Sequence, residues 1–213
     1  MAIEGGRDIA PLINSLLSLP FPLKIATQDF HPPGHISFAT SHDPPNNEAF
    51  KSYVRTFNPY NGSQKIRIPV WPEHCLQGTQ GVEIIPEIDA SRFDYIVQKG
   101  KDKRVEMWSA FADLFGNKTT LAANLDLAKL LKDAAITHLF VVGLAGDHCV
   151  GCTALGGKNE GFRVFVIEDA VKSVDTGPNG WIATKAAFAR AGVGLIHMDS
   201  AELDPVKTFS VPP

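Results

Sequence analysis

Apolar residues recur along the chain in stretches with either helical or extended spacing. Between Arg7 and Leu19 they lie three or four positions apart, which predicts an amphipathic helix that Pro20 ends. Further along, short apolar runs typical of buried strands alternate with longer helical patterns. The predicted strands are 23–27, 95–99, 139–142, 163–167 and 193–198, and the further predicted helices are 121–135, 149–158 and 181–191.

This alternation of helices and apolar strands predicts an α/β fold. Short connections between such elements are typical of a parallel sheet covered by helices on both faces. We therefore expect a three-layer, doubly wound, mostly parallel sheet. Segment 32–81 is rich in Pro and Asn and shows little periodicity, so we expect a long irregular loop there. Since no repeat or linker interrupts the pattern, residues 1–213 are expected to form a single domain.

Composition narrows the classes of function. The 213 residues are 44% hydrophobic and 20% charged, with a formal net charge of -3, as in an ordinary globular protein. No basic run indicates a nucleic-acid or anionic-membrane surface, and no apolar stretch reaches the roughly 18–20 residues that span a bilayer. The N-terminus lacks a signal-peptide layout, and three cysteines do not suggest a disulfide framework. We expect a cytoplasmic protein, with a nuclear or peroxisomal location left open.

Cys149 is the candidate nucleophile. A Gly-Leu-Ala-Gly turn follows the strand 139–142 and brings Cys149 to the expected first turn of a helix. Backbone N–H groups and the positive end of a helix dipole favour thiolate over thiol there, and the thiolate is the reactive form. Cys149 and Cys152 also have C-x-x-C spacing, but a redox or zinc motif needs a second ligand pair or a thioredoxin-like context.

A possible metal site follows the first predicted strand. Asp29 and His31 are two residues apart, so in extended chain their side chains point the same way and could share a cation. His74 is the natural third ligand, whereas His35 and His42 are weaker candidates. Each has a simpler interpretation, since a surface hydrogen bond explains the pair and a backbone-bonded loop histidine explains His74.

Other charged residues also lie near the ends of predicted strands. Ligands bind outside the carboxyl ends of strands in an open parallel sheet. Lys99 ends one strand and, next to a thiol, would stabilise the thiolate; by default it is solvated. Glu106 is interpreted as a surface helix residue, and Asp147 and Asp169 as capping or turn residues.

Taken together, these motifs resemble those of a known family. The chain resembles the nicotinamidases of the isochorismatase-like cysteine hydrolase superfamily, most closely their fungal members, over nearly its whole length. The segments that carry the resemblance are Gly-Gly-Arg-Asp-Ile-Ala-Pro (5–11), Thr-Gln-Asp-Phe-His (27–31), His-Ile-Ser-Phe-Ala (35–39), Trp-Pro-Glu-His-Cys (71–75), Gln-Lys-Gly (98–100), Ser-Ala-Phe (109–111) and Gly-Leu-Ala-Gly-Asp-His-Cys-Val (143–150).

The resemblance implies roles for the residues singled out above. It makes Cys149 the nucleophile and Lys99 the second member of a Cys-Lys-Asp triad. It implies that a divalent metal, usually zinc, is bound by three ligands. These are Asp29, His31 and His74. Glu106 matches a position where some members place a carboxylate near the metal.

The resemblance also implies the surroundings of the nucleophile. The bond between Leu144 and Ala145 matches a position that is cis in the family. The N–H groups of Ala145 and Cys149 would form the oxyanion hole, and Trp71 and Trp108 would wall the pocket. The implied reaction converts nicotinamide to nicotinate and ammonia in NAD salvage, in an enzyme expected to be a homo-oligomer.

One departure from the family pattern concerns the third member of the triad. The family's first strand ends in the triad aspartate, whereas Met1–Gly6 match the loop that follows that strand. We therefore expect that the first strand is missing and that hydrolysis is impaired, since a general base typically contributes about 100- to 10,000-fold.

Two alternatives stay open. One is an inactive relative that keeps a nicotinamide- or metal-binding pocket, and the other is a related amidase of the same superfamily. Nicotinate release with and without a restored upstream strand would separate an enzyme from a binding protein.

Overall fold

The computed structural model describes residues 2–209 and has an α/β fold. The chain divides into two compact units. The first unit consists of Thr27–Glu83 and Val97–Asp126. The second unit consists of Ala2–Ala26, Ile84–Ile96 and the described residues from Leu127 onward. No helix in the described part of the chain is long and apolar enough to cross a membrane.

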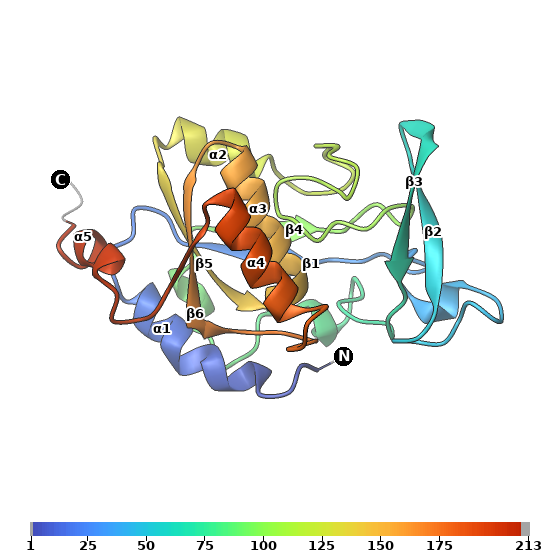
Figure 1. Cartoon of the computed structure of the whole chain (residues 1–213), viewed down its shortest axis with the longest axis horizontal. Helices are drawn as coiled ribbons and strands as arrows, with labels where there is room; N and C mark the ends of the chain where they lie inside the picture. The colour runs from blue at the N-terminus through green and yellow to red at the C-terminus, as the bar shows by residue number, and fades with distance from the viewer. Residues whose placement is uncertain (1, 210–213) are drawn as a thin grey trace. The chain divides into compact units, whose positions relative to one another are not determined.

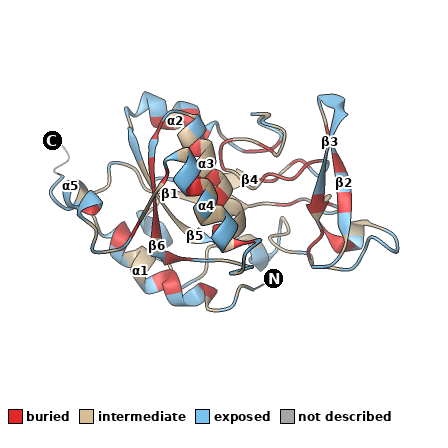
Figure 2. Cartoon of the chain, in the orientation of Figure 1, coloured by how far each residue is buried: buried red, intermediate tan, exposed pale blue. Residues whose placement is uncertain are grey.

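A parallel sheet forms the centre of the second unit. Its strands are β5 (His138–Leu144), β6 (Arg163–Lys172) and β7 (Gly194–Ile196), with β6 in the middle. In Figure 2 most of β6 is coloured as buried, which agrees with its apolar sequence. The predicted parallel sheet is therefore confirmed for this unit.

Helices cover both faces of this sheet. Helix α1 (Ala10–Leu17) packs Leu16 against Phe165 and Ile167 of β6. Because side chains alternate along a strand, the buried Val164 and Val166 point to the opposite face. Helix α3 packs against β6 and α4 against β7, and Figure 1 shows these two helices side by side in front of the sheet. The bounds of the remaining helices are Leu127–Asp133 for α2, Gly151–Asn159 for α3, Trp181–Ala191 for α4 and Asp204–Lys207 for α5.

The core under α1 supplies a test of this packing. Ile167 is 0% exposed in that core, so Ile167→Ala should lower the free energy of unfolding by about 2–5 kcal/mol. Ile182→Ala is the matched control, since Ile182 is 52% exposed and its truncation leaves no cavity. Urea denaturation measures both. Equal losses in the two variants would show that the Ile167 core does not stabilise the unit in the way described.

The first unit contains the carboxyl ends of two paired strands and a separate hairpin. Strands β1 (Ile25–Asp29) and β4 (Tyr95–Lys99) pair with each other. Strands β2 (Tyr53–Asn58) and β3 (Asn61–Pro69) form an antiparallel hairpin, visible in Figure 1. At the base of the hairpin lies a small apolar core that consists of Ala39, Val54, Ile68 and Val70.

The expectation of an irregular loop over 32–81 is wrong for residues 53–69, which form this hairpin. Side chains of β2 do alternate between buried and exposed, but the pattern is not one of apolar and polar residues. Thr56 and Asn58 are buried polar residues, whereas Phe57 and Tyr60 are exposed aromatic ones. Thr56 donates its hydroxyl to the Arg104 carbonyl, which lets it replace an apolar residue in the interior.

The helix predicted over 121–135 is shorter, because α2 begins at Leu127. The residues before it bond to the segment around β4 instead of continuing the helix. Lys101 donates its N–H to the Ala122 carbonyl, and Asn124 donates its N–H to the Gln98 carbonyl. These contacts use the backbone groups that a longer helix would need.

The other predicted elements are present with small changes at their ends. The strand 95–99 and the helix 181–191 match β4 and α4 residue for residue. The strand predicted to end at Ile167 continues as β6 to Lys172, through a register shift against β5.

Candidate functional site

A buried ion pair joins the ends of β1 and β4. Lys99, whose side chain is 2% exposed, donates from Nζ to Asp29 Oδ1 at 2.5 Å and to the Met107 carbonyl at 2.9 Å. The ends of these two strands thus bring Asp29 and Lys99 together. A buried charge is costly unless it is paired and hydrogen-bonded, and Lys99 meets both conditions.

The surroundings of Asp29 keep its carboxyl group ionised. Burial raises its pKa, but the Lys99 ammonium and the His31 ring outweigh burial, so that the pKa lies below the usual aspartate value. A carboxylate in this state has lone pairs available for a cation in addition to its bond with Lys99.

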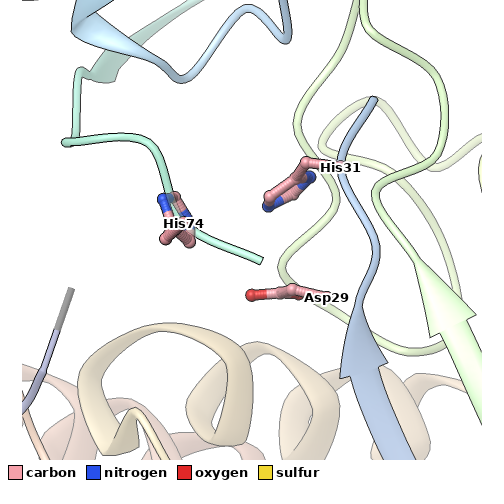
Figure 3. Close-up of side chains that lie close together, drawn as sticks. All are labelled: Asp29, His31 and His74. Atoms are coloured by element: carbon pink, nitrogen blue, oxygen red, sulfur yellow. The ribbon is translucent and has the colours of Figure 1, made fainter. Parts of the chain in front are cut away.

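Asp29, His31 and His74 converge, as Figure 3 shows. One ligand atom of each lies within 4.8 Å of the others. His31 Nδ1 lies 2.9 Å from the Gly100 carbonyl, and His74 Nδ1 lies 2.8 Å from the Pro72 carbonyl. Since a carbonyl can only accept, each Nδ1 carries a proton, which leaves Nε2 as the nitrogen able to bind a metal. One carboxylate oxygen and two imidazole nitrogens in this state form a donor set that suits zinc.

Gly100 allows the His31 ring to stand where it does. Its backbone has a φ of +69°, a conformation that favours glycine, and its carbonyl bonds to His31. A Cβ atom at this position would lie 2.5 Å from His31 Cε1 and 2.7 Å from His31 Nδ1. The ring and any larger residue at position 100 therefore exclude each other.

A second group of possible ligands shares His31. It contains His35 and Glu106, whose ligand atoms also lie within 4.8 Å of one another and of His31. His35 is 0% exposed, and its ring centroid is 4.1 Å from that of His31. His35 Nδ1 is 2.7 Å from Ser37 Oγ, whereas Nε2 is buried without a hydrogen-bond partner. The Ser37 N–H donates to His35 Nδ1 at 3.3 Å, so the neutral ring carries its proton on Nε2.

The pKa values of the two ionisable groups beside His31 are both shifted downwards. Burial lowers the pKa of His35 to about 4, so the ring is neutral near pH 7. Burial raises the pKa of Glu106, but the nearby His35 and His31 lower it by more, so that it lies below the usual glutamate value. Glu106 is 3% exposed and accepts the Met107 N–H at 2.8 Å, so its interpretation as a surface residue is wrong.

The sequence makes His35 a weaker candidate for a metal ligand, whereas the structure places it beside His31. The signal for this position in the sequence is the spacing His-Pro-Pro-Gly-His, in which a turn can bring His35 back to His31.

Two other residues of this loop lie outside the groups of possible ligands. His42 Nε2 lies 2.7 Å from the Ile36 carbonyl, and His42 belongs to neither group of possible ligands. Burial raises the pKa of the Cys75 thiol to about 11, which disfavours the reactive thiolate.

Cys149 lies in the second unit, on a turn between β5 and α3. The Leu144–Ala145 peptide bond is cis, as predicted, and a π-helical turn over Gly146–Val150 follows it. The Ala145 carbonyl accepts the N–H groups of His148 and Val150, both at 3.0 Å. The expected helix start at Cys149 is therefore corrected, because α3 begins two residues later and Cys149 lies on the π turn before it.

The remaining predicted site residues are Ala145, Trp71 and Trp108. Ala145 is 8% exposed at the start of the π turn, and Trp71 is 9% exposed, with its ring edge-on to Phe50. Trp108 is half-buried. Neither group of possible metal ligands among residues 2–209 includes a cysteine, so the zinc interpretation of the C-x-x-C spacing gains no support.

The chain is similar to known proteins in sequence and in fold. Residues 50–193 match the model of the isochorismatase domain. A nicotinamidase of Acinetobacter baylyi is 34% identical over 175 residues, which cover 82% of this chain and 74% of that protein. A solved nicotinamidase and pyrazinamidase of Acinetobacter baumanii is 32% identical with a TM-score of 0.78, covering 92% of this chain and 86% of the other.

A further solved structure contains a metal. The pyrazinamidase of Pyrococcus horikoshii, in complex with zinc, is 26% identical with a TM-score of 0.67, covering 92% of this chain and 88% of the other. The match to the domain model includes most of the chain, and the sequence identity extends beyond it. The chain therefore belongs to the isochorismatase family.

Proposed function

We propose that this protein hydrolyses nicotinamide to nicotinate and ammonia, with a zinc ion held by Asp29, His31 and His74. The observation that carries the proposal is the convergence of one ionised carboxylate and two imidazoles whose Nδ1 atoms are bonded to carbonyls, in a chain whose relatives are nicotinamidases. The product would enter reactions that consume nicotinate, as in NAD salvage.

Cys149 is the proposed nucleophile. Its sulfur forms a bond to the carboxamide carbon, the C–N bond breaks as the proton lost by the thiol reaches the nitrogen, and ammonia leaves; water then hydrolyses the thioester that remains. The N–H groups of Ala145 and Cys149 are the proposed donors to the oxyanion, and one such donor contributes about 3–4 kcal/mol in a comparable hydrolase.

Lys99 and Glu106 are proposed to set the electrostatic surroundings of the thiol and of His31, respectively. The Lys99 ammonium stabilises negative charge as the thiol loses its proton, and its bond to Asp29 fixes the direction of Nζ. Glu106 adds a negative charge beside His31. The family resemblance gives the proton transfer itself to an aspartate that no position of this sequence matches, so we assign no residue to that step.

The zinc ion would orient the substrate and polarise it as a Lewis acid. Asp29, His31 and His74 are the residues that would hold it, and the aromatic rings of Trp71 and Trp108 are proposed to exclude water from the pyridine ring. Of these three ligands His31 is buried, whereas Asp29 and His74 are half-buried.

Gly100→Ala should weaken zinc binding. The new Cβ would overlap the His31 ring, so the ring must move and its bond to the Gly100 carbonyl must break. Loss of such an orienting partner typically lowers metal affinity about 10- to 100-fold. Zinc affinity measured by competition with a chelator tests this.

Gly116→Ala is the matched control. Gly116 also has a positive φ, +84°, but nothing lies within 4 Å of a Cβ built there. Its substitution therefore introduces the same kind of backbone strain without touching a ligand, and zinc affinity should be unchanged. Equal weakening in both variants would show that strain alone explains the effect.

The experiment that tests the function is product release by the purified zinc-loaded protein. We expect nicotinate and ammonia in equal amounts, with loss of both after chelation and recovery when zinc is restored. Protein that binds zinc yet releases no nicotinate would contradict the proposal and favour a non-catalytic, pocket-retaining relative.

The rate of benzamide hydrolysis distinguishes the proposed nicotinamidase from a related amidase. It has the same carboxamide but no ring nitrogen, so an enzyme that recognises nicotinamide through this nitrogen should hydrolyse it far more slowly. Equal rates for the two amides would favour an amidase with a broader range of substrates.

A further inference from the structure

The Asp147 carboxylate ties the turn that carries Cys149 to the chain that follows β6. Its Oδ1 accepts the N–H of Val174 at 2.9 Å, and its Oδ2 accepts the N–H of Asp175 at 2.8 Å. The Asp147 side chain is 1% exposed. A buried carboxylate that accepts two consecutive backbone donors forms a rigid link between two segments that lie far apart in the sequence.

The charge on Asp147 strengthens this link. Burial raises the pKa of Asp147, but the neighbouring His148 ring, 3.3 Å from Oδ1, and the two N–H donors outweigh burial and keep the pKa below its usual value. Hydrogen bonds to an ionised acceptor are about twice as strong as neutral ones.

The linked segment leads directly into α4. The Asp175 carbonyl accepts the N–H of Trp181, the first residue of α4, at 2.8 Å. The Asp175 carboxylate accepts the N–H of Gly177 at 2.7 Å. Asp147 therefore attaches the π turn to a short, internally bonded loop rather than to a loose one.

The π turn itself has no room to shift towards its neighbours. A Cβ atom on Gly146 would lie 2.4 Å from Ser173 Oγ, 2.7 Å from Val171 Cγ1 and 2.9 Å from Trp181 Cε3. The backbone of the turn thus packs directly against the end of β6 and the start of α4. Contact on this side and the Asp147 bonds together define one position for the turn.

We propose that Asp147 is a positioning residue for the nucleophile, and that it sets the reactivity of Cys149 by fixing the backbone of the π turn. The proposal rests on the proposed role of Cys149. Asp147 acts through the backbone, because its two carboxylate oxygens accept the N–H groups of Val174 and Asp175. Without this link, the turn would no longer hold the thiol beside the N–H groups and the helix dipole that favour its thiolate.

The test compares the alkylation of Cys149 in wild type, Asp147→Asn and Asp147→Ala. Iodoacetamide labels the thiolate, and mass spectrometry of the Cys149 peptide gives the rate at each pH. We expect the alkylation profile to move towards higher pH, with a rate about 10-fold lower near pH 7 in Asp147→Ala, which corresponds to a tenfold smaller thiolate fraction. The alkylation rate of Asp147→Asn should lie between those of wild type and Asp147→Ala, because the amide keeps one acceptor oxygen.

The steady-state readout separates positioning from general damage. The kcat for nicotinamide should fall in the order of the alkylation rates, whereas KM and zinc content should be unchanged, because Asp29, His31 and His74 belong to the first unit. Asp169→Ala is the matched control. Asp169 also links two segments of the second unit: it lies 2.9 Å from His197 Nδ1 and accepts the N–H of Met198 at 2.8 Å, and neither partner belongs to the π turn.

Two results would overturn the inference. One is an alkylation profile of Asp147→Ala that matches wild type. The other is an equal change in Asp169→Ala, which would point to general loosening of the unit. If Asp147→Ala does not fold, as judged by circular dichroism, the alkylation profile of Asp147→Asn decides instead, and a profile that matches wild type would overturn the inference. If wild type releases no nicotinate, the proposed function fails, and the alkylation profiles still decide the role of Asp147.

Discussion

Cys149→Ala is expected to lower the rate of nicotinate release on the order of 10⁴-fold or more, because no thioester can form without the sulfur. Zinc content should stay at the wild-type level, since neither group of possible metal ligands among the described residues contains Cys149. Product release measured by chromatography and zinc measured by atomic absorption test the two halves of this prediction.

Cys152→Ala serves as the control for this substitution. Cys152 lies three residues further along, on α3, and completes the C-x-x-C spacing. If Cys149 acts alone as the nucleophile, Cys152→Ala keeps its activity. If both variants lose activity together, a dithiol mechanism replaces the one proposed, and loss of zinc in Cys149→Ala would contradict the separation of nucleophile and metal ligands.

His31→Ala is expected to have the largest effect on the metal. His31 is the one residue shared by both groups of possible ligands, and its Nε2 is directed by the bond between Nδ1 and Gly100. Removing a ligand costs more than removing the partner that orients it, so zinc affinity should fall by at least about 100-fold and turnover should fall with it. Chelator competition measures the affinity.

The control for His31→Ala removes a histidine that lies outside these groups. His138 begins β5, is exposed, and belongs to neither group. His138→Ala should bind zinc with wild-type affinity. Stoichiometric zinc in His31→Ala with unchanged affinity would place the metal elsewhere in the chain and would remove the basis for the proposed site.

The sequence predicts the second unit well where local signals and burial agree. Helix α4 is ended by Gly192, whose φ of +71° is the left-handed conformation typical of a helix C-terminus. Strand β6 begins with an apolar run that suits a strand buried on both faces. Its continuation to Lys172 could not be predicted, because Glu168 and Asp169 interrupt the apolar pattern and pairing with β5 resumes beyond them.

The site depends on contacts between residues distant in sequence, and these are harder to predict. The motif around His31 indicates a metal ligand, but the bond between Lys99 and Asp29 requires β1 and β4 to be neighbours. His35 shows no signal beyond its spacing, since its burial against His31 depends on the fold of the loop. The sequence predicts a capping or turn role for Asp147. Its bonds to the N–H groups of Val174 and Asp175 could not be predicted, because they join segments that are far apart in the sequence.

The hairpin β2–β3 shows a different limit. Its buried positions include polar residues that find partners, such as Thr56 with the Arg104 carbonyl, and its exposed positions include aromatic ones. A pattern search for alternating apolar residues therefore misses it.

The central claim is that the carboxamide passes through a thioester on Cys149, and hydroxylamine tests it directly. Hydroxylamine intercepts a thioester in competition with water and converts a nicotinoyl group to nicotinohydroxamate. The account predicts that, during turnover of nicotinamide, the ratio of hydroxamate to nicotinate rises with hydroxylamine concentration and that Cys149→Ala forms neither product. Nicotinate formed at an undiminished rate, with no hydroxamate at any hydroxylamine concentration, would contradict it.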